Sequence, residues 1–258
     1  MKSEITFEER KVIQLEMLKE IDAFCRVHEI KYSLAFGTLL GAIRHNGFIP
    51  WDDDVDIMMP LPDMLKFKEL FKSDNLKYCD IDTEKHYEFG FSRIAHLNTF
   101  NKIGLVRSCY GICIDLYPII GVPSEKDNIE KFFKKASYFQ NRRLAFMKWQ
   151  SRAVRYLPVI SLPGFDNAIR DYRDFMYSYY PYESAKTFYI IAGPFELKEK
   201  MIYNFDLFDE LTEVVFENNT FLSTSHFDDF LSMRYGDYMT PPPEDQRHPY
   251  HGGHYYWK

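Results

Sequence analysis

Apolar residues recur at helical spacing in the first part of the chain. Thr6 followed by Glu9 has the pattern of a capping box, which predicts that a helix begins here and runs to about Val27. The apolar face of this helix is expected to contain Leu15, Leu18, Ile21 and Cys25.

Short apolar runs separated by helical patterns follow. These runs are predicted to be strands over Tyr32–Phe36, Val55–Met59, Tyr87–Leu97 and Gly111–Ile120. A helix over Leu39–Arg44 is expected between the first two strands, and Pro62-Asp63 is expected to open another. The alternation of strands and helices predicts an α/β or α+β fold built on a mixed sheet.

The pattern changes after Pro123, where Ser124 begins a long helical segment. The further elements expected are a helix at about Asp166–Tyr180, a short strand at Phe188–Ile191, a helical turn at Asp228–Arg234 and an irregular tail from Thr240. We therefore expect a core over residues 1–122 that bears the functional site and a mainly helical region over residues 123–258 that packs on this core and closes over the ligands of that site.

Composition and cysteine spacing narrow the class of protein. The 258 residues are long enough for a large core, and the net charge of −6 argues against nucleic acid as a partner. Cys25, Cys79, Cys109 and Cys113 have no metal-site spacing and are expected to be reduced thiols. Neither a signal sequence nor an apolar run of about 20 residues is found, so a soluble cytoplasmic protein is predicted.

The acidic run that ends in Asp54-Val-Asp56 carries the clearest chemical signal. In a strand, side chains two residues apart point the same way with Cα atoms roughly 6.5 Å apart. Two such carboxylates can share a pair of divalent cations about 4 Å apart, as in phosphoryl displacement. Asp52 and Asp53 are expected to support these ligands or cap the turn, and the alternative is a solvated acidic loop.

Asp115 is a further candidate for a functional carboxylate. It lies inside the apolar run Gly111–Ile120, where an aspartate is costly unless it is paired or metal-bound. A metal ligand and a salt-bridged core carboxylate are the two interpretations. As a ligand, Asp115 is also placed to take the proton of an attacking hydroxyl.

Two segments resemble a known family. Gly37-Thr-Leu-Leu-Gly-Ala-Ile-Arg44 with Phe48-Ile-Pro-Trp-Asp-Asp-Asp-Val-Asp56, and the C-terminal Met233–His248, are similar to the LicD family of nucleotidyltransferase-fold proteins, which includes the fukutin-related group. The resemblance implies a nucleotidyltransferase-like core that adds a third carboxylate from a later strand. It also implies transfer of a phosphorylated alcohol from a CDP-linked donor to a glycan hydroxyl. In the namesake enzymes the donor is CDP-choline.

Donor-binding residues are expected around the glycine turn. Gly37 and Thr38 would hold phosphate oxygens through backbone N–H groups and the hydroxyl. Arg44 is expected either to contact phosphate with its fork of donors or to pair with Asp52 or Asp53. Arg93 resembles a family position, and its alternatives are phosphate binding and a buried ion pair. Trp51 is expected to wall the donor site or to pack.

Two further segments leave alternatives open. Residues 131–156 are basic and aromatic, which fits either peripheral contact with the inner membrane surface and a lipid-linked glycan or an ordinary basic solvent face. His248, His251 and His254 are interpreted as a second metal site or as a flexible polar terminus. From the resemblance, Arg247 and His248 are expected to help close the active site.

The prediction is therefore an enzyme, a phosphotransferase that uses two Mg²⁺ or Mn²⁺ ions to move phosphocholine, or a related phosphorylated alcohol, from a CDP-linked donor to a glycan or lipid-linked glycan. The rivals are an Asp-x-Asp nucleotide-sugar glycosyltransferase, a nucleotidyltransferase that uses a triphosphate, and a non-catalytic glycan-binding protein.

Overall fold

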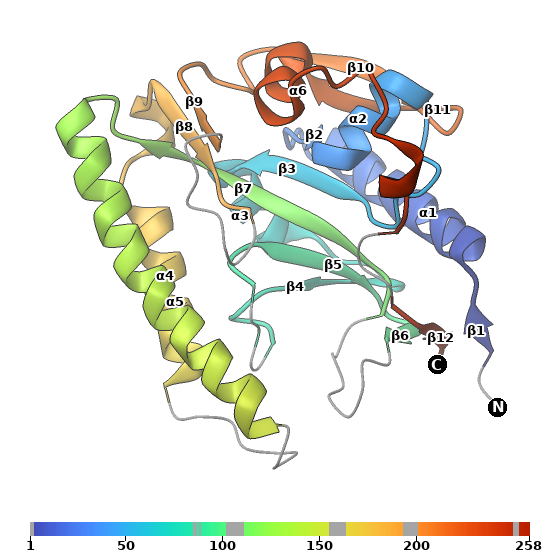
Figure 1. The fold of residues 1–258 in the computed structure, drawn as a ribbon, viewed down its shortest axis with the longest axis horizontal. Coiled ribbons are helices and arrows are strands. Elements are labelled where there is room, and N and C mark those ends of the chain that lie inside the picture. The colour runs from blue at the N-terminus through green and yellow to red at the C-terminus, as the bar shows by residue number, and fades with distance from the viewer. Residues whose placement is uncertain are drawn as a thin grey trace. The chain divides into compact units, whose positions relative to one another are not determined.

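The chain forms two compact units. The computed structural model describes residues 3–84, 87, 89–101, 111–154, 164–192, 201–249 and 253–258, without the side chains of 146–154. Unit 1 consists of Met1–Lys77, Arg93–Leu116 and Leu207–Lys258, and unit 2 of Tyr78–Ser92 and Tyr117–Asp206. The mixture of helices with a mixed sheet confirms the predicted fold class (Figure 1).

The first helix, α1 (Phe7–Val27), begins as the capping box predicted. The Glu9 backbone N–H donates to Thr6 Oγ1 (3.2 Å), and the Thr6 N–H donates to Glu9 Oε2 (2.8 Å). The buried face differs in part from the expected one, because Leu15 is only partly buried whereas Arg10 and Gln14 are buried. A buried arginine requires a polar partner, and its partner lies in the acidic run.

The main sheet supports the candidate site. Its elements in chain order are β2 (Ser33–Leu34), α2 (Phe36–His45), β3 (Asp56–Pro60), α3 (Leu61–Leu70), β4 (Leu76–Cys79), β5 (Ser92–His96) and β7 (Cys113–Val122). The strand order is β2-β3-β7-β5-β4, with β2 antiparallel to β3. The predicted strand at Tyr32–Phe36 is shorter than expected, because helix α2 already begins at Phe36.

Unit 1 also contains strands that the sequence did not predict. The segments β1 (Glu4–Ile5), β12 (Tyr255–Trp257) and β6 (Thr99–Asn101) form a sheet in the order β1-β12-β6, so the expectation of an irregular tail is wrong for its last residues. The strands β10 (Leu211–Phe216) and β11 (Asn219–Thr224) form a hairpin. Figure 1 shows this hairpin, α2 and α6 (Phe227–Tyr235) gathered together.

Unit 2 is built around two helices. They are α4 (Lys126–Val154) and α5 (Phe165–Ser178), which pack through rings such as Phe132 and Phe175, whose centroids are 5.6 Å apart. The predicted strand at Phe188–Ile191 is β8 (Thr187–Ile190), which pairs with the end of β7 and with β9 (Ile202–Tyr203). In the part of the chain that the structure describes, no helix is long and apolar enough to cross a membrane.

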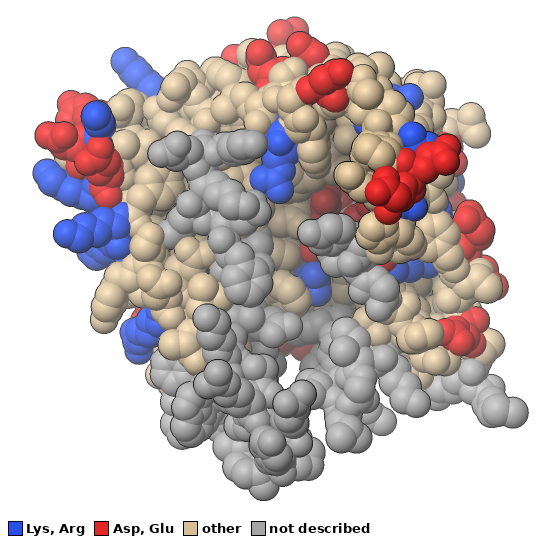
Figure 2. Space-filling model, viewed as in Figure 1, with Lys and Arg blue, Asp and Glu red and all other residues tan. Residues whose placement is uncertain are grey.

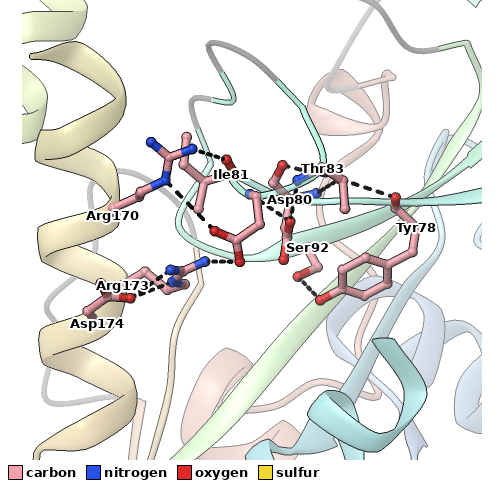
Figure 3. Close-up of polar contacts among 9 residues, drawn as sticks. Tyr78, Asp80, Ile81, Thr83, Ser92, Arg170, Arg173 and Asp174 are labelled. Carbon is pink, nitrogen blue, oxygen red and sulfur yellow. Dashed lines mark hydrogen bonds and ion pairs between the residues drawn. The ribbon is translucent and has the colours of Figure 1, made fainter. Parts of the chain in front are cut away.

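The loop after β4 is fastened to α5 in unit 2 (Figure 3). Asp80 Oδ1 accepts hydrogen bonds from the backbone N–H groups of Asp82 (2.9 Å) and Thr83 (3.0 Å). Arg173 donates to the Asp82 carboxylate (2.5 Å), and Arg170 donates to the Ile81 carbonyl (3.1 Å). Because these groups satisfy one another, we interpret this network as a fastening of the loop rather than as a ligand site.

Candidate functional site

The glycine turn begins with a strained residue. Phe36 has φ = +45°, a left-handed conformation that a bulky side chain adopts at a cost of order 1–3 kcal/mol. Helix α6 supports it, since the Phe230 ring lies 5.7 Å from the Phe36 ring and the Arg234 guanidinium lies 5.1 Å from it. This conformation ends β2 and directs the first turn of α2 toward the acidic run.

The glycine turn and the acidic run are in direct contact. A Cβ placed on Gly37 would lie 2.5 Å from Asp52 Oδ2, so only glycine allows the carboxylate to approach this closely. The Asp56 backbone N–H donates to Thr38 Oγ1 over 2.8 Å. The hydroxyl of Thr38 therefore fixes the start of β3 and keeps its own proton to donate. The sequence prediction that these two motifs form one site is consistent with this geometry.

Three consecutive carboxylates converge after this turn. Oxygen atoms of Asp52, Asp53 and Asp54 all lie within 4.8 Å of one another. Burial raises the pKa of Asp52 to about 8, and the nearby Asp54 and Asp53 carboxylates add to the shift. Asp53 is buried, and Asp52 and Asp54 are partly buried. A cluster of partly buried carboxylate oxygens that repel one another fits a hard divalent cation such as Mg²⁺ or Mn²⁺.

Asp54 and Asp56 were predicted as ligands on the assumption that both lie in one strand, and the structure differs from this assumption. β3 begins at Asp56, so Asp54 precedes the strand and lies with Asp52 and Asp53 in the converging group. Asp56 is buried at the start of the strand. The geometry thus brings Asp52 and Asp53 as close to the candidate metal position as Asp54, and direct ligation by Asp54 and Asp56 stays a prediction.

Asp115 and Arg93 form a bidentate ion pair. Arg93 Nε lies 2.7 Å from Asp115 Oδ1, and Arg93 Nη2 lies 3.0 Å from Asp115 Oδ2. The Asp115 backbone N–H donates to the carbonyl of Val55 (3.0 Å), the residue between Asp54 and Asp56. The structure therefore contains the salt bridge considered for both residues, and it places Asp115 on the strand beside the acidic run. The roles of Asp115 as a ligand and of Arg93 as a phosphate contact stay predictions.

The predicted basic donor contact lies at the end of α2. Arg44 donates to the Tyr238 carbonyl (2.7 Å) and lies 3.0 Å from His45 Nε2, and within the described residues it forms no ion pair with Asp52 or Asp53. Burial and the nearby Arg247 lower the pKa of Arg44. Arg247 in turn lies over the Trp51 ring (5.4 Å). Because no carboxylate in the described part of the chain pairs with Arg44, its guanidinium is suited to an incoming anion.

The histidines of the tail do not join the carboxylates in the described part of the chain. His248 is exposed, His251 lies outside the described residues, and His254 Nδ1 contacts Glu4 Oε1 at 2.5 Å. Among the described residues, Asp52, Asp53 and Asp54 form a group of three side chains that could hold a metal ion. Neither His248 nor His254 belongs to such a group.

Comparison with known proteins identifies the family of this chain. The family model described as LicD/FKTN/FKRP, nucleotidyltransferase domain, matches residues 29–163 of the chain. The chain belongs to this family. Along 260 aligned residues it is 26% identical to the lipopolysaccharide cholinephosphotransferase LicD of Haemophilus influenzae, and the alignment covers 96% of each protein. An uncharacterized protein of Rickettsia typhi is 29% identical over 110 residues, which are 42% of this chain and 29% of that protein.

Sequence reasoning missed residues of this LicD-family chain that lie outside the matched range. Arg10 of α1 pairs with Asp53 (3.1 Å). Tyr235 at the end of α6 is 41% exposed. Partial desolvation raises the pKa of its hydroxyl, and the negative charges of Asp56 and Asp52 add to the shift, which places Tyr235 within electrostatic reach of the site. Arg10 gave no signal, since an arginine four residues after a helix cap is usually exposed. Tyr235 belongs to the C-terminal LicD-like segment, which marked its neighbourhood but not its role.

Proposed function

We propose that this LicD-family phosphotransferase transfers phosphocholine from CDP-choline to a hydroxyl of a cell-surface glycan, with divalent metal ions held by the acidic run. The observation that carries the proposal is the convergence of Asp52, Asp53 and Asp54 beside the first turn of α2. The full-length similarity to a lipopolysaccharide cholinephosphotransferase supports the choice of phosphocholine and of a glycan acceptor.

The carboxylates would hold the metal ions. Asp54 and Asp56, with Asp115 from the neighbouring strand, are the ligands that we propose, and Asp52 and Asp53 lie close enough to take part. Bound Mg²⁺ or Mn²⁺ supplies positive charge that neutralises the donor diphosphate and the charge that develops during transfer. All other steps depend on the chain's own residues.

The glycine turn and the two arginines would orient the donor. The backbone N–H groups at Gly37 and Thr38 open helix α2, where the helix dipole favours phosphate. Arg44 would bind a phosphate oxygen, and Trp51 would wall the nucleotide side. Arg93 holds Asp115 in one orientation through two hydrogen bonds, and it would contact the donor as well.

Transfer is one displacement at phosphorus. The acceptor hydroxyl oxygen forms a bond to the phosphorus next to choline, and the bond from that phosphorus to the oxygen of CMP breaks. Asp115, held by Arg93, takes the proton of the hydroxyl. Positioning of the two reactants provides a large part of the acceleration. We propose that residues 1–122 supply this machinery and that residues 123–258 help bind and enclose donor and acceptor.

Contact with a lipid-linked acceptor at the inner membrane surface is a further element of the proposal. Lys131, Lys134 and Lys135 are exposed on α4, whereas Arg143 is buried against the Tyr172 ring (4.9 Å). Figure 2 shows acidic and basic side chains together over the start of α4, so its described face carries both signs of charge. A cytoplasmic protein with weak, salt-sensitive membrane contact fits this surface better than a firmly bound one.

Phosphorus NMR with a panel of donors tests the proposal. Purified protein with Mg²⁺ or Mn²⁺ would be given CDP-choline, CDP-ethanolamine, CDP-glycerol, CDP-ribitol, nucleotide sugars and nucleoside triphosphates. We expect release of CMP and phosphocholine from CDP-choline, roughly 100-fold slower release with Asp54→Asn, and none with EDTA. Release of UDP or GDP from a nucleotide sugar would instead indicate a glycosyltransferase, and diphosphate release from a triphosphate would indicate a nucleotidyltransferase. Undiminished turnover in Asp54→Asn would remove the acidic run from the mechanism.

A further inference from the structure

A buried ion pair lies behind the acidic run. Arg10, in the first turns of α1, is 7% exposed, and its Nη1 lies 3.1 Å from Asp53 Oδ2. Asp53 itself is 2% exposed. An ion pair this deeply buried holds its partners firmly, because removal of one leaves the other charged and without water. The middle residue of the three converging aspartates is therefore fixed from helix α1.

The C-terminal strand covers the other side of this arginine. The Arg10 guanidinium lies 4.5 Å from the centre of the Tyr255 ring. Tyr255 belongs to β12, where it is opposite Ile5 of β1 and Asn101 of β6. Because β12 pairs on both edges, the ring is held in place over the guanidinium, and Arg10 contacts both Asp53 and an aromatic face.

The neighbouring residues of α1 hold the same loop and the next strand. Lys11 Nζ donates to the Pro50 carbonyl (3.1 Å), two residues before Asp52. Gln14 Nε2, one turn further along, donates to the Cys113 carbonyl (3.5 Å) of β7, the strand that carries Asp115. One face of α1 thus contacts both chain segments that bear the carboxylates, and α1 precedes the range that the family model matches.

We propose that Arg10 and Tyr255 are positioning residues for the acidic run: together they hold the Asp53 carboxylate, and through it the backbone that aims Asp52 and Asp54 at the metal ions. The inference rests on the proposed metal site and concerns what shapes it. It assigns a positioning role at this site to the N-terminal helix and the C-terminal strand.

Metal binding without substrate tests this inference. Binding of Mn²⁺ would be followed by electron paramagnetic resonance for the full chain and for Arg10→Met, Arg10→Lys, Tyr255→Leu and Tyr255→Phe. The control is Arg26→Met in the same helix, which removes the ion pairs of the exposed Arg26 with Asp22 (2.9 Å) and Glu213 (2.8 Å). We expect the affinity for Mn²⁺ to fall by roughly 10- to 100-fold in Arg10→Met and Tyr255→Leu. Arg10→Lys, Tyr255→Phe and the control should keep an Mn²⁺ affinity within about threefold of the unchanged protein. Arg10→Lys keeps the positive charge, Tyr255→Phe keeps the ring, and the control leaves both Arg10 and Tyr255 in place.

Turnover separates a positioning role from a purely structural one. In Arg10→Met at saturating Mn²⁺ we expect kcat for CDP-choline to fall by roughly tenfold with KM for the donor nearly unchanged. Unchanged Mn²⁺ affinity and kcat with only a lower melting temperature would overturn the inference. If Arg10→Met does not fold, Tyr255→Leu decides by the same measurements. If Asp54→Asn also leaves Mn²⁺ binding unchanged, the proposed metal site itself is wrong. That result differs from one in which only the positioning role of Arg10 and Tyr255 is wrong.

Discussion

Replacement of Gly37 by alanine separates the chemistry of the site from the stability of the fold. The added Cβ would lie 2.5 Å from Asp52 Oδ2 and 3.5 Å from its Cγ, so the carboxylate must swing away. Gly37 is in α2 without a positive φ, so alanine favours the helix by about 0.5–1 kcal/mol. The crowding costs about 1–3 kcal/mol when it is not relieved, and here a side-chain end relieves much of it. The two effects nearly offset one another.

We therefore expect Gly37→Ala to change the free energy of unfolding by less than about 2 kcal/mol in urea titrations. In the same protein, Mn²⁺ affinity and turnover of CDP-choline should fall by roughly 10- to 100-fold, because Asp52 no longer faces Asp54. Wild-type turnover and Mn²⁺ affinity in a folded Gly37→Ala protein would refute the reasoning.

Gly41→Ala in the same helix is the matched control. Its Cβ would meet the Gly47 backbone oxygen at 2.5 Å and the Ile49 nitrogen at 3.3 Å, and backbone cannot swing aside as a carboxylate can. The expected result is a loss of stability of at least about 1–3 kcal/mol in the same urea titrations. A Gly41→Ala protein that is as stable as Gly37→Ala would show that these approach distances do not govern the outcome.

Three further changes test separate parts of the account. Asp54→Asn should lower turnover roughly 100-fold and remove its response to added Mg²⁺, measured by CMP release. Arg44→Lys keeps the charge but loses the fork that contacts the Tyr238 carbonyl, so KM for CDP-choline should rise about tenfold in initial-rate assays, whereas an unchanged KM would exclude a donor contact. Burial first, and then its hydrogen bond to Asp22 (2.6 Å), raise the pKa of Tyr32. The stability due to neutral Tyr32 is thus complete below the unfolded pKa of about 10 and is lost as the pH rises above it, by at most about 1.4 kcal/mol per pH unit. Unfolding titrations from pH 8 to 11 should show a smaller slope for Tyr32→Phe.

Local patterns predicted the elements whose signals lie close together in sequence. The capping box at Thr6 and Glu9 starts α1, and the apolar run around Asp115 is β7. The early start of α2 was not predictable, because the left-handed Phe36 depends on α6, which lies almost 200 residues later in the chain. Secondary structure that depends on such remote support leaves no periodic pattern.

In the candidate site too, contacts between nearby motifs could be predicted, whereas contacts with distant parts of the chain could not. The motif order brought Gly37, Thr38 and the acidic run together, and the structure has them in contact. The convergence of Asp52 with Asp54 differs from the strand phase that was assumed, because the strand begins only at Asp56. Arg10 was missed because its partner is 43 residues away, and an arginine at helical spacing gives no sign that it is buried.

The position of bond cleavage in CDP-choline tests the central claim most directly. The donor would be hydrolysed by the protein with Mg²⁺ in oxygen-18 water without an acceptor, and the products would be weighed by mass spectrometry. Attack at the phosphorus next to choline predicts that the label enters phosphocholine and that CMP stays unlabelled. Label in CMP would mean attack at the nucleotide phosphorus and would contradict the account.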